Sequence, residues 1–175
     1  MSATTMLKAT KTNDLWQTPL YAVKPIVPYL KPKSKILCPF DNLYSAYVYV
    51  LRAAWHKVTY GHTDIGKDFF DVTQKQAEKF DYIISNPPYS IKDAVFKHLF
   101  LLDRPFAMLM ACNGIFEGER YNLFKYKNIQ IMVLRPRVAF LDSDGIPQKS
   151  PCFQSWYICY GLNLPKDIMF TELEK

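Results

Sequence analysis

Short apolar runs alternate with helix-like segments between residues 35 and 112, and this alternation constrains the fold more than any other feature of the chain. Strands that alternate with helices form parallel sheets covered on both faces, and right-handed crossovers make such a sheet doubly wound. We therefore expect an α/β, Rossmann-like fold. The expected strands lie within residues 33–40 (ending near Cys38), 56–62, 80–85 and 105–112. The expected helices lie within 45–55, with Ser45 near its start, 73–80, and 90–103, with Ser90 as its N-cap.

The segments on either side of this alternation have a different character. In residues 16–30, Thr18 is the expected N-cap and Pro19 the first helical residue, and Pro25 and Pro28 interrupt the helix that follows. Near the other end, residues 129–141 and 151–161 predict two strands of an antiparallel hairpin at the sheet edge, and residues 165–175 a short strand or helix. Residues 1–13 are expected to be a flexible tail, and residues 14–175 a single domain.

Charge and composition restrict the kinds of partner. There are 22 Lys and Arg against 16 Asp and Glu, a net charge of +6, which is compatible with a nucleic-acid partner. The 4 cysteines and 3 histidines show no metal-ligand spacing, so we expect no metal site and free thiols in a reducing cytoplasm. No apolar run has the length of a membrane span, so we expect no membrane association.

Three polar or aromatic turns directly follow the first three expected strands. They read "CPFDN" from Cys38, "HTDIGKDFF" from His62 and "NPPY" from Asn86. In an open parallel sheet, ligands bind beyond the carboxyl ends of the strands. The sequence therefore predicts a ligand site where these three turns meet.

The "NPPY" turn, residues 86–89, has the composition of a rigid grip for a planar amino group, and we call it the elbow. Asn86 offers a side-chain carbonyl oxygen, Pro87 fixes the direction of its own carbonyl, and Tyr89 offers a ring for stacking. Two acceptors and a ring suit an exocyclic amine on a base, or an amide nitrogen. The alternative is a plain Pro-Pro turn, but Asn-Pro-Pro-aromatic arises by chance in fewer than about one in a hundred chains of this length.

These residues resemble a known family. "FDYIISNPPYS" resembles the catalytic motif of the amino-methyltransferases, which use S-adenosylmethionine, and among them the N6-adenine DNA methyltransferases. The segments "DLWQTPLYAV", "GKDFFD" and "SPCFQSWYICYG" resemble the small phage-type members. The resemblance covers about residues 16–160, and it implies a Rossmann-like methyltransferase fold. It also implies a phage-encoded protein that works in the cytoplasm of a bacterial host.

The resemblance also implies a set of cofactor-binding residues. Thr18 and Pro19 match the helix start that holds the methionine carboxylate. The turn after the first strand matches the segment beside the methionine part, and it comprises Cys38, Pro39, Phe40 and Asp41.

For the adenosine part, Asp64, or alternatively His62, matches the position that holds the ribose hydroxyls. Asp68 matches the residue that bonds the adenine amine, and Phe69 the residue that packs on its ring. The resemblance thus places the adenosine half of S-adenosylmethionine along the turn that follows the second strand.

The family resemblance assigns the elbow to catalysis, through Asn86, Pro87, Pro88 and Tyr89. It implies direct attack of the target nitrogen on the sulfonium methyl group, with most of the rate enhancement coming from positioning. Phe140 or Phe153 is a further candidate for packing on the target base. In duplex DNA the base has to be flipped out of the helix, a cost that a single-stranded target avoids in part.

The chain departs from the family at the first turn. The family pattern resembles D-P-x-x-G-x-G, whereas this turn reads "CPFDNLYSAYV" and no glycine lies between Lys35 and Tyr60. Glycines in such turns allow close approach to the ligand. Three accounts remain open: a turn rebuilt with Asp41 and Ser45 that still binds, weak cofactor binding, or a degenerate fold that acts as a non-catalytic nucleic-acid- or protein-binding module.

We expect no separate recognition domain beyond the segment that the resemblance covers. We therefore expect relaxed sequence preference, a partner subunit or homodimer, or recognition through residues 142–151. DNA is the expected substrate, with single-stranded DNA, an RNA base or a protein glutamine as alternatives. Phosphate contacts from the scattered Lys and Arg would make the affinity salt-dependent.

Overall fold

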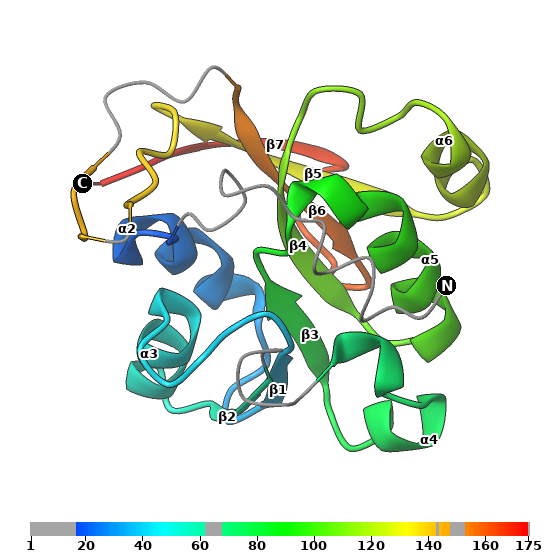
Figure 1. The fold of residues 1–175 in the computed structure, drawn as a ribbon, viewed down its shortest axis with the longest axis horizontal. Helices are drawn as coiled ribbons and strands as arrows, with labels where there is room; N and C mark the ends of the chain where they lie inside the picture. Colours follow the sequence, from blue (N-terminus) through cyan, green and yellow to red (C-terminus); the bar gives the residue numbers. More distant parts are fainter. Residues whose placement is uncertain (1–16, 62–67, 143, 148–152, 175) are drawn as a thin grey trace.

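A seven-stranded sheet forms the centre of the molecule in the computed structural model, which describes residues 17–61, 68–142, 144–147 and 153–174. The strand order is β2-β1-β3-β4-β6-β5-β7, and Figure 1 shows the sheet between two helical layers. The strands are β1 (Lys35–Cys38), β2 (Lys57–Tyr60), β3 (Tyr82–Ser85), β4 (Phe106–Ala111), β5 (Ile129–Arg135), β6 (Ser155–Tyr160) and β7 (Ile168–Glu172).

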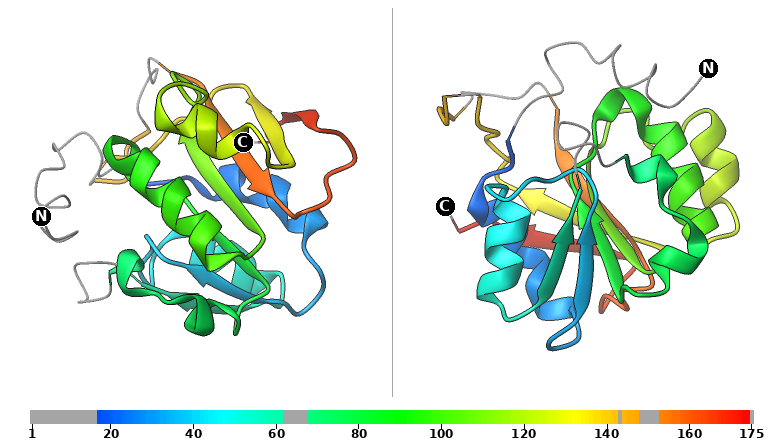
Figure 2. Two further views of the ribbon diagram at one scale, coloured as in Figure 1. Left: turned by 90° about the vertical axis from the view of Figure 1, so that its right-hand side faces the viewer. Right: turned by 60° about the horizontal axis from the view of Figure 1, so that its bottom comes forward.

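Helices cover both faces of the sheet, as the two views of Figure 2 show. One face carries α2 (Leu20–Val23), the 3-10 helix η2 (Lys24–Tyr29) and α3 (Ala46–Ala53). The other carries η4 (Phe69–Asp71), α4 (Gln74–Ala77), η5 (Tyr89–Ile91), α5 (Lys92–Leu102) and α6 (Glu119–Phe124). Two apolar layers result. Strands buried on both faces therefore read as continuous apolar runs, and all six residues of β4 are buried.

Strand pairing confirms the predicted fold class. β2, β1, β3 and β4 pair in parallel, while β6 is antiparallel to both β4 and β5. The sheet is therefore Rossmann-like and doubly wound, with an antiparallel C-terminal hairpin. The hairpin's predicted place at the edge is wrong, because residues 168–172 form β7, which pairs in parallel with β5 and takes the edge.

Two predicted helix starts are also wrong. The N-cap of α2 is Pro19, with φ −73° and ψ 152°, because the backbone of Gln17 pairs with Leu141 and keeps the preceding chain extended. The N-cap of α5 is Ile91 rather than Ser90, because the prolines of the elbow lead into a 3-10 turn first. The expected start of α3 near Ser45 is confirmed, and Ser45 is its N-cap, whereas α6 had not been predicted.

A buried pair of tyrosines joins the sheet to the helices α2 and α3. The hydroxyl of Tyr157 on β6 donates to the carbonyl of Ala22 at 3.0 Å, and it lies 3.0 Å from the hydroxyl of Tyr47 on α3. A hydroxyl has one hydrogen, so Tyr47 is the donor to Tyr157. Burial raises the pKa of both phenols above their ordinary range, and both stay neutral.

The direction of these bonds predicts unequal effects of removing each hydroxyl. Tyr157→Phe leaves both the Ala22 carbonyl and the Tyr47 hydroxyl without a partner, and it should lower the free energy of unfolding by about 2–4 kcal/mol. Tyr47→Phe removes only a donor, and it should cost about 1 kcal/mol. Urea denaturation of the two variants measures the difference; equal losses would contradict the assigned direction.

Candidate active site

The carboxyl ends of β1 and β3 lie side by side at the point where the strand order reverses. β1 pairs with β2 on one side and β3 on the other, so the chain leaves β1 toward one edge of the sheet and returns to build the other. Such a switch point opens a crevice where doubly wound proteins bind ligands. The turn after β1 and the elbow after β3 both begin there, and the fold therefore brings two of the three predicted turns together.

The elbow presents a buried acceptor that has no partner. Asn86 follows the last residue of β3, and its side-chain Oδ1 is buried without a hydrogen-bond partner among the described residues. Pro87 is buried, and Pro88 has φ −57° and ψ 128°, which leads into η5. A buried acceptor without a partner costs free energy, so a donor bound at the elbow would stabilise it.

A buried hydrogen bond ties the elbow to the turn after β1. The hydroxyl of Ser85, the residue just before the elbow, donates to Oδ2 of Asp41, and the two residues are 0% and 6% exposed. Burial raises the pKa of Asp41 to about 7, while hydrogen bonds from Ser85 and Ser45 act in the opposite direction. The carboxyl group of Asp41 thus links the turn after β1 to the elbow.

The turn that lacks glycine is built from side-chain hydrogen bonds. The Ser45 hydroxyl accepts from the backbone N–H of Asn42 at 2.9 Å, and the Asn42 side chain accepts from the N–H of Tyr44 at 2.9 Å. None of residues 42–45 has a positive φ. Tyr44 is 91% exposed and Leu43 48%, so their side chains face solvent. The structure thus agrees with a turn rebuilt on Ser45, with Asp41 directed inward.

Tyr89 is fixed in a cluster of three rings. Its ring meets Phe153 at 5.4 Å and Phe140 at 6.5 Å between centroids, both edge to face. Its hydroxyl lies 3.5 Å from the hydroxyl of Ser155. Phe140 is only 1% exposed and Phe153 is partly exposed. Of the two residues proposed to pack on a base, Phe153 is therefore the more accessible.

The predicted adenine-binding pair lies on the neighbouring turn. Asp68 is the N-cap of η4, and its Oδ1 accepts from the N–H of Phe70 at 2.9 Å. Phe69 is 3% exposed, and its ring packs edge to face against Phe40 at 5.0 Å and His98 at 4.8 Å. The contact with Phe40 brings two predicted cofactor segments together, although the Phe69 ring is enclosed by other rings.

The remaining predicted residues differ in how they are placed. Cys38 ends β1 and is fully buried, with its pKa raised by burial, and its carbonyl accepts from the N–H of Gly61 at 3.1 Å. Pro39 is buried beside it. Thr18 and Pro19 precede a helix of only 4 residues. Asp64 and the alternative His62 lie outside the described residues, as does half of the proposed recognition segment 142–151.

A third segment of the candidate site, residues 112–118, follows β4, and it was not predicted from the sequence. Arg120 is 6% exposed; it forms an ion pair with Asp93 and donates to the carbonyls of Ile115, at 3.1 Å, and Gly114. Lys92, the first residue of α5, donates to the carbonyl of Asn113 at 2.9 Å. Residues 112–118 are therefore held beside the elbow by α5 and α6.

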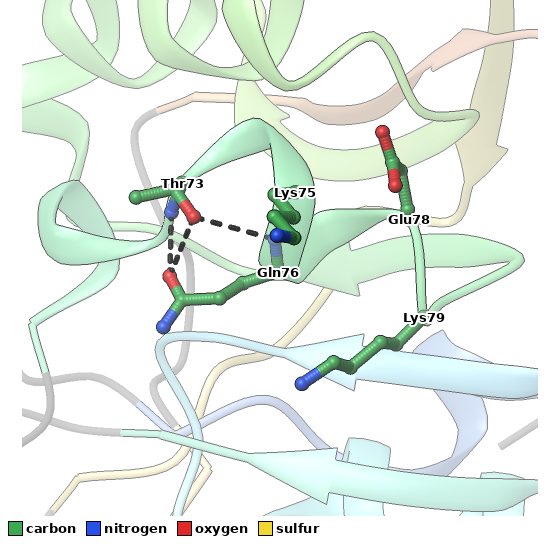
Figure 3. Close-up of a pocket in the computed structure, with 5 residues that line it drawn as sticks. All are labelled: Thr73, Lys75, Gln76, Glu78 and Lys79. Atoms are coloured by element: carbon green, nitrogen blue, oxygen red, sulfur yellow. Dashed lines mark hydrogen bonds between the residues drawn. The ribbon is translucent and has the colours of Figure 1, made fainter.

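A hollow of about 540 Å³ beside α4 has a different character. Figure 3 shows its lining, in which the N–H and hydroxyl of Thr73 donate to Gln76 Oε1 and the N–H of Gln76 donates back to the Thr73 hydroxyl. This is a capping box that satisfies the start of α4. The five lining residues are exposed, so the hollow is a surface depression without a buried reactive group.

Fold and site together define a doubly wound α/β protein with the elbow, residues 86–89, at its switch point. Comparisons with protein-family models and with curated proteins find no match. Among solved structures, the chain is similar to a predicted O-methyltransferase from Agrobacterium tumefaciens, with 11% identity, coverage of 84% of this chain and 83% of that chain, and a TM-score of 0.48. Similarity at this level is too low to indicate what this chain does.

The described residues contain neither a membrane-spanning helix nor a metal-binding cluster. No helix within them is long and apolar enough to span a bilayer. Within the same ranges, no group of three or more His, Cys, Asp or Glu lies in an arrangement that could hold a metal ion.

Proposed function

We propose that this chain transfers a methyl group from S-adenosylmethionine to the exocyclic N6 amine of adenine in DNA, with relaxed sequence specificity. The observation that carries the proposal is the buried Oδ1 of Asn86 at the carboxyl edge of β3, for which the described part of the chain offers no hydrogen-bond partner. An amine N–H is the donor that this acceptor lacks. The resemblance of residues 80–90 to the amino-methyltransferase motif supports the same reading.

Each residue of the elbow then has a role in holding the amine. Asn86 Oδ1 and the Pro87 carbonyl accept the two amine hydrogens, which favours a tetrahedral nitrogen with an available lone pair. Tyr89, fixed by Phe140 and Phe153, supports the ring that carries the amine. These contacts lower the barrier by positioning, because the reacting nitrogen is held in one orientation.

The turn after β1 fits the cationic half of the cofactor. When bound, S-adenosylmethionine supplies a methyl group on a positively charged sulfur. The Asp41 carboxyl, buried and with a pKa of about 7, gains a favourable interaction when a cation lies nearby. We assign Asp41 to this half and Asp68 to the adenine amine. The enclosed ring of Phe69 fits the adenine half less well, because little of it is exposed.

A second candidate is a binding module without catalysis. The enclosure of Phe69 by Phe40 and His98 favours it, since an adenine ring then needs another surface. Isothermal titration calorimetry with S-adenosylmethionine distinguishes the two functions. Absence of binding at millimolar cofactor would sink the enzyme, whereas salt-dependent nucleic-acid binding without cofactor binding would establish the module.

The substrate is tested with S-adenosylmethionine labelled in the methyl group. Duplex DNA, single-stranded DNA and RNA are offered in parallel, each alongside a matched strand in which every adenine already carries an N6-methyl group. We expect label in the unblocked DNA only, recovered as N6-methyladenine after hydrolysis. Label in RNA alone, or equal label in blocked strands, would replace adenine in DNA by another amine as the target.

A further inference from the structure

The two edges of the sheet are built differently. On the β2 edge the exposed residues are Lys57 and Thr59, and such charged and polar side chains prevent edge-to-edge pairing. On the β7 edge, Ile168 is 54% exposed and Phe170 is 79% exposed. No strand in the described part of the chain pairs with the outer side of β7. The β7 edge therefore combines open backbone groups with exposed apolar side chains.

The backbone of β7 directs alternate residues outward. The carbonyl of Asp167 accepts from Ile131 at 2.7 Å, and the N–H of Leu173 donates to Arg135 at 2.6 Å, so both residues face β5. Since this direction alternates along a strand, the N–H and C=O of Ile168 and Phe170 point away from the sheet. Glu172 points outward in the same way, so the outward backbone groups of β7 belong to Glu172 and to the two residues with exposed apolar side chains.

We propose that β7 pairs with β7 of a second copy of this chain, antiparallel and across a two-fold axis at Met169. This register places Ile168 opposite Phe170 of the second copy, twice, as hydrogen-bonded pairs. The exposed Lys166, just before the strand, faces Glu172 of the second copy. The apolar residues meet each other, and Lys166 meets Glu172, only when the second strand is a copy of β7.

Apolar side chains on one face of the sheet extend from β7 across β5 to β6. Phe170 lies beside Val133 and then Trp156, and Ile168 lies beside Ile131 and then Ile158, across three strands. In the pair, the row that ends at Phe170 continues into the row that begins at Ile168 of the second copy. Cross-strand apolar pairs of this kind stabilise sheets, and the two sheets become one.

Sedimentation velocity over a range of micromolar concentrations tests the proposal. The wild-type protein should sediment as a dimer. Phe170→Lys should weaken association at least about thirtyfold, as for a central interface residue, with an unchanged far-ultraviolet circular dichroism spectrum because Phe170 is 79% exposed. Trp55→Lys is the matched control. Trp55 is an 83% exposed aromatic in the turn between α3 and β2, the strand at the opposite edge of the sheet from β7. Its replacement should leave the dimer intact.

A charge pair tests the register itself. Ile168→Glu and Phe170→Lys should each give monomers, whereas the double variant places opposite charges across the two-fold axis and should restore the dimer. A monomeric wild type at every concentration would overturn the proposal, and so would a Phe170→Lys dimer. Failure of the double variant to recover would overturn the register. Methyl transfer has no part in these readouts, so they are independent of the proposed function.

Discussion

Replacing Asn86 with leucine is expected to make the protein more stable and inactive. Leucine has nearly the shape of asparagine without its polar atoms, so it removes a buried acceptor that has no partner. Relief of this cost should raise the free energy of unfolding by about 1–3 kcal/mol. The same change removes the amine contact, and methyl transfer should fall at least about 10²-fold, as when one oriented hydrogen-bonding group is deleted from an active site.

Three measurements separate the parts of this prediction. Urea denaturation reports stability, labelled methyl transfer reports activity, and calorimetry reports cofactor binding, which should persist. Asn128→Leu is the control, because Asn128 is exposed in the turn before β5, and it should change none of the three. A less stable Asn86→Leu variant that keeps full transfer would remove Asn86 from the site.

Among the carboxylates of the described residues, Asp41 is the one whose replacement by asparagine is expected to change the pH dependence of stability most. The pKa of Asp41 rises from 3.8 to about 7 on folding, because burial disfavours the charged form. Between these values the folded state holds a proton that the unfolded state has released, so the free energy of unfolding falls as the pH rises. Over this window the loss amounts to roughly 4 kcal/mol.

Asparagine keeps a polar partner for Ser85 and has no charge to bury, so Asp41→Asn should lose this decline and exceed the wild type in stability at pH 8. Denaturation curves at intervals from pH 4 to 8 give the comparison. Asp144→Asn makes the same chemical change at an exposed position, and it should follow the wild-type curve. Identical curves for all three proteins would show that Asp41 ionises without cost.

The same carboxyl group links protonation to the cofactor. If a cation binds beside Asp41, the pKa of this carboxyl falls, and a proton is released near pH 7. Calorimetry in two buffers of different ionisation enthalpy measures that release. We expect it from the wild-type protein and not from Asp41→Asn.

The fold was predictable where the pattern is local. Apolar runs such as residues 82–85 and 106–111 are buried strands, and their alternation with helices determines the parallel part of the sheet. The place of β7 was not predictable, because its pattern of exposed and half-buried residues describes an edge only once β5 is beside it. The start of α2 depends on the long-range pairing of Gln17 with Leu141, which no local pattern contains.

The site divides in a similar way. The elbow was recognisable from four adjacent residues, but its partner Ser85 was overlooked even though it is a polar residue at the end of an apolar strand and directly before Asn86. The inward direction of Asp41 and the solvent exposure of Tyr44 depend on how Asn42 and Ser45 close the turn. The enclosure of Phe69 depends on His98, a residue of α5 that is distant in the sequence.

The position of β6 has a consequence for synthesis on the ribosome. β4 is completely buried, and its outer side is covered by residues 155–160, which are translated long after β4 itself. Until those residues emerge, the nascent chain carries an apolar strand with an open edge, and slow long-range pairing of this kind exposes a chain to aggregation. Premature termination before residue 155 should therefore produce a chain that requires chaperones and cannot complete its sheet.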